Sequence, residues 1–233
     1  MENKILPQFK DKKTFIGISF SSIPSTESAV AVIDENLNVI SLDKLFSMHD
    51  IHNFLTTMSG VKNSVIAVSM SKNEVMISNK WKYVSRVYHP VNLNSRIKNT
   101  DGWADRFSKK GTDFFRELKT SGYDIFRFDI HNVKMAFGCN DAFLERSPAD
   151  CKALQYGLRE KLNMRSLPTN MLPVSELEAI LGAYTVYCYS RENQKCKKLF
   201  DFHGLEVVGF LQGLCSMPLR TLSLEMTPES KSI

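Results

Sequence analysis

Long apolar runs are missing from this sequence. No stretch approaches the roughly 20 consecutive apolar residues that a membrane-spanning helix requires. The opening residues, MENKILPQFKDKKTF, carry charges and a proline instead of the apolar segment of a secretory signal. We therefore expect no association with a membrane and a cytoplasmic location.

Cysteine is also sparse. The five cysteines are odd in number and widely spaced, and no two of them form a C-x-x-C pair. This spacing excludes the usual patterns of a zinc knuckle and of a disulfide framework. We expect reduced thiols that pack as small hydrophobic side chains, and no cofactor.

Extreme charge is absent as well. The formal net charge is +5 for 233 residues, which suits contact with a polyanion but is far below the charge of a dedicated nucleic-acid arm. With 43% hydrophobic residues the chain can bury a single large core. We predict one domain over residues 1–233 with a core of about 14–211, a flexible N-terminus and C-terminal tail, and an irregular insertion at about 71–111.

The first third of the chain is rich in short β-branched runs. Residues 14–19, 29–33 and 39–40 are apolar and separated by turn-type residues, which predicts a three-stranded antiparallel meander. The apolar spacing in residues 41–58 predicts a helix. The compact run NSVIAVSM, residues 63–70, predicts a strand buried on both faces at the centre of a parallel sheet.

The second half alternates helical and strand patterns. Ser147 and Pro148 predict the start of one helix, and Ser175 is placed to cap the most strongly periodic one. The further elements predicted are a helix at 112–122, a strand at 123–130, helices at 147–163 and 173–190, and a hairpin at 199–211 that turns near 203–204.

This order of elements, together with the segments FIGISF, IAVSMS, IFRFDI and ELEAILGAYTVY, resembles the RNase H-like superfamily. The most similar branch is domain-of-unknown-function family 429, which is itself similar to the Holliday-junction resolvase-like predicted nucleases. The resemblance covers about residues 15–211. It implies an α/β fold with a mixed central sheet, three antiparallel strands followed by parallel strands, and flanking helices.

The resemblance also implies where the acidic residues of a nuclease centre would lie. The four family positions fall on Ser19, Ser69, Arg127 and Glu178, so three of the four acids are replaced. Asp129 would share a face with Arg127 in a regular strand and could keep some acidity nearby. Glu178 and Asp129 are therefore the candidate catalytic residues, at a site that is otherwise degenerate.

These replacements act against metal-dependent hydrolysis. Two-metal cleavage needs several converging carboxylates, whereas a serine hydroxyl is neutral and a guanidinium repels a cation. We predict weak metal affinity, little or no nuclease activity, and a charge-assisted pair between Arg127 and Glu178. The leading hypothesis is a non-catalytic binding or regulatory domain that acts on nucleic acid.

The candidate contact with nucleic acid is a segment in which cations and aromatic rings alternate, NKWKYVSRVYHPVNLNSRIKN. Cations can follow phosphates while rings stack on bases, as in proteins that bind single strands of DNA or RNA. An irregular solvated loop anchored by its rings would have the same composition. The residues concerned are Lys80, Trp81, Lys82, Tyr83, Arg86, Arg96 and Lys98.

Two alternatives remain open. One is a nuclease that depends on Mg²⁺ or Mn²⁺ and uses Asp129 and Glu178 with a further acid such as Glu74 or Asp105. The other is a structural or protein-interaction module, which would bind another protein or a second copy of this chain. A fold by itself does not choose among these functions.

Overall fold

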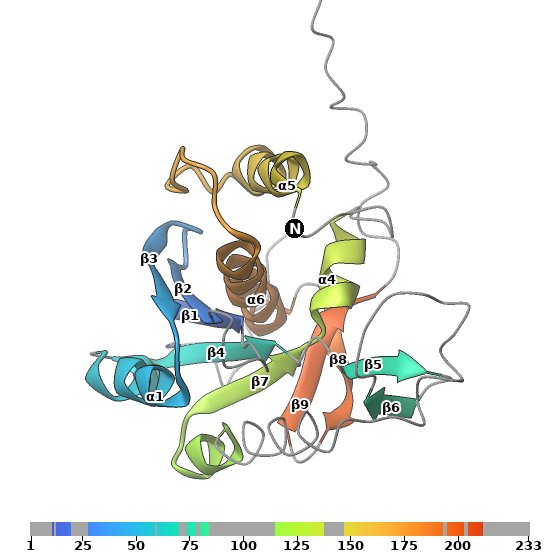
Figure 1. Ribbon diagram of the computed structural model, residues 1–233. Coiled ribbons are helices and arrows are strands. Elements are labelled where there is room, and N and C mark those ends of the chain that lie inside the picture. The colour runs from blue at the N-terminus through green and yellow to red at the C-terminus, as the bar shows by residue number, and fades with distance from the viewer. Residues whose placement is uncertain are drawn as a thin grey trace, which may run out of the picture.

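The structure is a computed structural model that describes residues 11, 13–19, 28–58, 60–69, 74–77, 80–83, 115–137, 147–192, 195–202 and 205–211. For the 74–77 and 80–83 segments it describes the backbone only. The described part contains a seven-stranded mixed sheet with helices on both faces, and a separate two-stranded ribbon (Figure 1).

The seven strands of the main sheet lie in the order β3-β2-β1-β4-β7-β9-β8. The pairs β1–β2 and β2–β3 are antiparallel, the pairs β1–β4, β4–β7 and β7–β9 are parallel, and β8 returns antiparallel to β9. The expected mixed sheet, with three antiparallel strands followed by parallel strands, is confirmed. Its strands are β1 Thr14–Ser19, β2 Ser28–Asp34, β3 Val39–Leu45, β4 Ser64–Ser69, β7 Asp124–Phe128, β8 Cys196–Phe202 and β9 Leu205–Phe210.

The helices form one layer on each side of this sheet. On one face α1 packs with residues 115–120, which are also helical; on the other face lie α4, α5 and α6 (Figure 1). The bounds are α1 Met48–Thr57, the short 3₁₀ helix η2 Val61–Asn63, α4 Ile130–Ala136, α5 Pro148–Lys161 and α6 Val174–Ser190.

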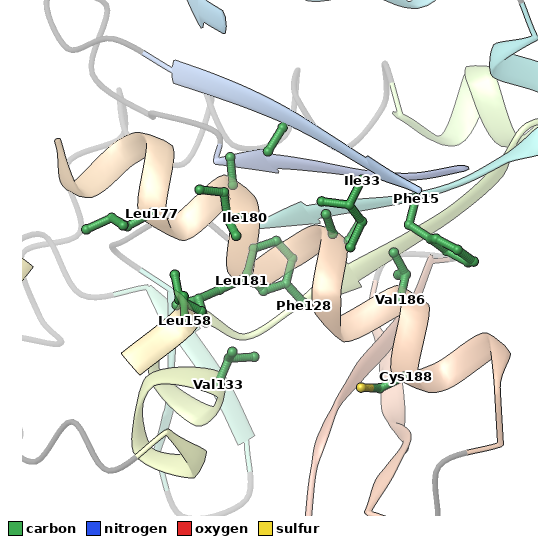
Figure 2. Packing of buried hydrophobic residues seen from close by; sticks show 14 of the residues in the cluster. Phe15, Ile33, Phe128, Val133, Leu158, Leu177, Ile180, Leu181, Val186 and Cys188 are labelled. Carbon is green, nitrogen blue, oxygen red and sulfur yellow. The ribbon is translucent and has the colours of Figure 1, made fainter. Parts of the chain in front are cut away.

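Strand alternation separates the core into two clusters. In β1, Phe15 belongs to the cluster on the α6 side, whereas Ile16 and Ile18 belong to the cluster on the α1 side. Helix α6 is apolar around most of its circumference because it lies between the sheet and α5. Figure 2 shows its side chains Ile180 and Val186 packed close to the sheet.

The helix predicted for residues 41–58 is wrong in its first part. Residues 39–45 instead form β3, where Leu42 pairs with Ala31 in the antiparallel ladder. The helix begins only after Ser47, whose hydroxyl accepts a hydrogen bond from the Asp50 amide. The apolar spacing of a short strand and of the following helix had merged into one apparent helical period.

Two further predictions need correction. Ser175 lies inside the first turn of α6, and the N-cap position is taken by Pro173, which makes no side-chain capping bond. The insertion predicted to be irregular contains an antiparallel ribbon, formed by β5 Glu74–Ile77 and β6 Lys80–Tyr83. The helix capped by Ser147 and the hairpin of β8 and β9 are confirmed.

The loop between α5 and α6 is held by one buried glutamine. The Gln155 amide donates to the carbonyl oxygens of Pro168 at 2.7 Å and Asn170 at 2.9 Å, and its oxygen accepts from the Leu172 amide at 3.0 Å. One buried side chain thus satisfies three backbone groups of the loop, of which the Leu172 amide is itself buried.

A Gln155→Ala variant is therefore expected to lose about 3 kcal/mol of unfolding free energy, since three hydrogen bonds of a buried side chain are removed at about 1 kcal/mol each. Urea unfolding measures the loss. Lys152→Ala, an exposed change on the same helix, is the matched control and should stay within about 0.5 kcal/mol of the wild type. Equal effects of the two substitutions would contradict the role given to Gln155.

Candidate functional site

The candidate site begins with two serines at the carboxyl edge of the sheet. The parallel register pairs Ile18 of β1 with Val68 of β4, so the next residues, Ser19 and Ser69, are neighbours on adjacent strands. Across the next pair of strands, Ser69 lies opposite Phe128 of β7. By strand alternation Ser19 and Ser69 face the same side as Phe128, which is the side covered by α6.

Helix α6 approaches this edge unusually closely, at Gly17. A Cβ atom built on Gly17 would lie 1.9 Å from the Ala179 carbonyl oxygen and 2.3 Å from the Ala183 amide nitrogen. One Cβ built on Gly182 would lie 3.4 Å from the Gly17 Cα and 2.6 Å from the ring of Phe128. The backbones of helix and strand therefore touch here, which only glycine permits.

This close contact determines what lies beside it. Four residues along a helix and two residues along a strand both cover about 6 Å. Glu178 lies four residues before Gly182 on α6, and Ser19 lies two residues after Gly17 on β1. The two residues are therefore displaced from the glycine contact by about the same distance. The two side chains meet as this geometry requires: the Ser19 hydroxyl donates to Glu178 Oε2 at 2.8 Å.

The other oxygen of the same carboxylate receives a cation. Lys134 Nζ lies 2.7 Å from Glu178 Oε1, and the side chains of the two residues are 8% and 1% exposed. An ionised carboxylate this deep in a protein needs a charged or hydrogen-bonding partner, because leaving water is otherwise too costly. Both oxygens of Glu178 are therefore engaged inside the protein.

Lys134 comes from α4, the short helix that follows β7. Its place was not found from the sequence. The available signal was its position among the apolar residues Val133, Met135 and Ala136, since a lysine that is buried is almost always paired.

The structure corrects the strand register assumed for the third family position. Ile125 belongs to the cluster on the α1 side, and Phe126 and Phe128 to the cluster on the α6 side. Alternation then places Arg127 with Ile125, facing away from α6. The residue that lies beside Ser19 and Ser69 on the α6 face, in one row across the three strands, is therefore Phe128. The cation that pairs with Glu178 is Lys134, whereas the sequence predicted Arg127.

Asp129, the second candidate acid, directly follows β7 and is half-buried. Its main-chain oxygen accepts the Val133 amide at 3.0 Å and so starts α4. Of the other acids considered, Asp105 lies beyond the described part of the chain, and Glu74 is described only by its backbone in β5.

These residues do not fit a Mg²⁺ or Mn²⁺ centre. Such ions take oxygen ligands, chiefly carboxylates, and Mg²⁺ requires near-octahedral geometry. The row offers two neutral hydroxyls and a phenyl ring, and the Glu178 carboxylate that faces it is already bonded to an ammonium group. Within the described ranges, no group of three or more His, Cys, Asp or Glu residues is placed to hold a metal ion.

The candidate nucleic-acid segment is described only in part. Lys80, Trp81, Lys82 and Tyr83 form the backbone of β6, paired with β5. Arg86, Arg96 and Lys98 lie outside the described residues.

Three of the five cysteines fall in the described part, and all three are buried free thiols: Cys151, Cys188 and Cys196. Burial raises the pKa of the Cys196 thiol, so it stays protonated and unreactive.

Among the described helices, none combines the length and apolar character that crossing a membrane demands.

Comparison with known proteins gives a distant likeness. No family model matches the sequence, and no curated protein matches it. Among solved structures, T. thermophilus RuvC in complex with Holliday junction substrate is similar at a TM-score of 0.41 and 12% identity, over 77% of this chain and 97% of that chain. At this level of similarity the chemistry of the site must be judged from the chain's own residues, and membership of domain-of-unknown-function family 429 stays a prediction.

Proposed function

We propose that this protein is an RNase H-like domain whose catalytic centre has been replaced by a closed ion pair, and that it acts by binding nucleic acid without cleaving it. The observation that carries the proposal is the state of Glu178. Its carboxylate is 1% exposed, bonded to Lys134 on one oxygen and to Ser19 on the other.

The charge of Lys134 opposes any metal at this place. Two unit charges 4 Å apart interact by about 4 kcal/mol at the effective dielectric constant of partly buried sites, and a divalent ion doubles that value. A metal would also have to displace a hydrogen bond from Ser19 and would gain only neutral hydroxyls in return. Pairing of the Glu178 carboxylate with Lys134 is therefore more stable than binding of a metal ion by that carboxylate.

The binding part of the proposal is supported by charge and composition. The chain carries a net charge of +5, and cations alternate with aromatic rings between Lys80 and Lys98. Phosphate contacts release counterions, so affinity falls steeply with salt. A surface that recognises another protein generally lacks that slope.

Fluorescence anisotropy with labelled single-stranded DNA or RNA tests this part. If four phosphates are contacted, affinity is expected to fall about 50-fold between 50 and 200 mM salt. Removing three cations with Lys80→Ala, Lys82→Ala and Arg86→Ala should weaken binding and flatten the slope. The control removes three lysines elsewhere, Lys152, Lys161 and Lys197, for the same change in net charge.

Two outcomes would contradict the binding role. One is no affinity at low salt for single- or double-stranded DNA or RNA. The other is an equal loss of affinity in both triple variants, which would mean that net charge alone is responsible.

The absence of cleavage has its own test. With Mg²⁺ or Mn²⁺ the wild type is expected to leave single strands, duplexes and branched DNA intact, and titration calorimetry should detect no tight metal binding. Metal-dependent cleavage that disappears in a Glu178→Ala variant would instead establish the nuclease alternative.

A further inference from the structure

Helix α4, which carries Lys134, is hydrogen-bonded to strand β9 through the side chain of Asn132. Asn132 donates from Nδ2 to the Phe210 carbonyl oxygen at 3.0 Å and accepts from the Phe210 amide through Oδ1 at 2.9 Å. Both backbone groups of one residue of β9 are thus bonded to one amide side chain, as a neighbouring strand would bond them.

The shape of β9 at this point is adapted to Asn132. A Cβ atom on Gly209 would lie 2.6 Å from Asn132 Oδ1, so a larger residue there would push the amide away. The end of α4 is held as well: the ring of Phe137 packs edge-on against Phe210 and Tyr184, at centroid distances of 6.0 and 5.6 Å. Burial raises the pKa of the Tyr184 hydroxyl, so this contact stays uncharged.

Asn132 and Lys134 act on different sides of α4. Residues two apart in a helix project about 200° from one another around its axis. Asn132 bonds β9, and Lys134 bonds Glu178 of α6. A helix of only seven residues has little stability of its own, so its position depends on its tertiary contacts, which include these two bonds and the packing of Val133 in the core.

We infer that Asn132 is the positioning residue for Lys134, and that the junction of α4 with β9 controls whether the Glu178 carboxylate is neutralised. This inference rests on the proposed function, in which the neutralised carboxylate is what excludes a metal. Displacing α4 from β9 would withdraw the ammonium and leave an anionic carboxylate beside Ser19 and Ser69.

A double-mutant cycle in the full chain tests the inference. The coupling between Lys134→Met and Glu178→Gln is measured by urea unfolding in the wild-type background and again with Asn132→Ala. If Asn132→Ala only weakens the fold, it lowers the stability of all four proteins of the cycle equally, and the coupling energy is unchanged. If Asn132 positions Lys134, the coupling energy itself falls. We expect most of the coupling to disappear with Asn132→Ala and also with Gly209→Ala.

Gln155→Ala is the matched background, because it weakens the domain at a buried side-chain amide of α5. It should leave the coupling unchanged. Coupling that survives in the Asn132→Ala background, or that falls equally with Gln155→Ala, would overturn the inference. No nucleic acid is present in this cycle, so its failure and the failure of the binding proposal are distinguishable.

A second measurement covers the case in which a corner of the cycle does not fold. The ammonium hydrogens of a buried, paired lysine exchange slowly enough to give an NMR signal, which Lys134→Gln would assign by its loss. We expect this signal to vanish in Asn132→Ala and persist in Gln155→Ala. Its persistence in Asn132→Ala would refute the positioning role.

Discussion

A Gly17→Ala variant is expected to be largely unfolded at 25 °C. The added Cβ would lie 1.9 Å from the Ala179 carbonyl oxygen and 2.3 Å from the Ala183 amide nitrogen. Both atoms belong to the backbone of α6, which cannot turn aside as a flexible side chain could. Relief requires the whole helix to move off the sheet, at a cost above about 4 kcal/mol, which approaches the total stability of a typical domain.

Far-UV circular dichroism and urea unfolding measure this effect. The control is Gly60→Ala, where φ is +79° and no atom lies within 4 Å of the added Cβ. That change should cost only about 1 kcal/mol, from the left-handed backbone conformation alone. A Gly17→Ala variant no weaker than Gly60→Ala would mean that α6 and β1 are not in backbone contact.

A Lys134→Met variant should be destabilised by about 3–5 kcal/mol, since Glu178 would keep its buried charge and lose its counterion. Adding Glu178→Gln removes that charge while its amide oxygen can still accept from Ser19. The double variant should recover about half of the loss or more. Denaturant midpoints of the three proteins give the comparison.

A double variant as unstable as Lys134→Met would contradict this account, because the loss would then come from packing of the lysine stem and not from the unpaired carboxylate. Asp150→Asn combined with Lys152→Met is a suitable control. It alters an acid and a lysine on α5, of which Lys152 is exposed, and should cost far less.

The main strands of the sheet could be predicted from the sequence because short apolar runs are separated by polar turns, as at 14–19 and 63–70. The strand β7 was predicted as well, at 123–130, but the face that its side chains turn toward α6 was not. Its residues Ile125, Phe126 and Phe128 are buried on both faces, so no alternation distinguishes one face from the other. This is why Arg127 was assigned to a row that Phe128 occupies.

Two residues of the candidate site, Glu178 and Ser19, could be placed from the sequence, because they lie on a long helix and a regular strand that face one another. Lys134 was not, because α4 spans seven residues and completes fewer than two helical periods. Its pairing depends on a tertiary contact of α4 with β9, which no local pattern encodes.

The backbone contact between β1 and α6 also has a consequence for how the chain is made. Ser19 and Glu178 are 159 positions apart, and the strand can complete its inner face only when the helix exists. At ribosomal rates of about 5–20 residues per second, about 10–30 seconds pass between the synthesis of β1 and the synthesis of α6. During that interval Phe15 and its neighbours on the sheet have no permanent cover, so nascent chains of this protein should depend on chaperones more than chains whose core contacts are local.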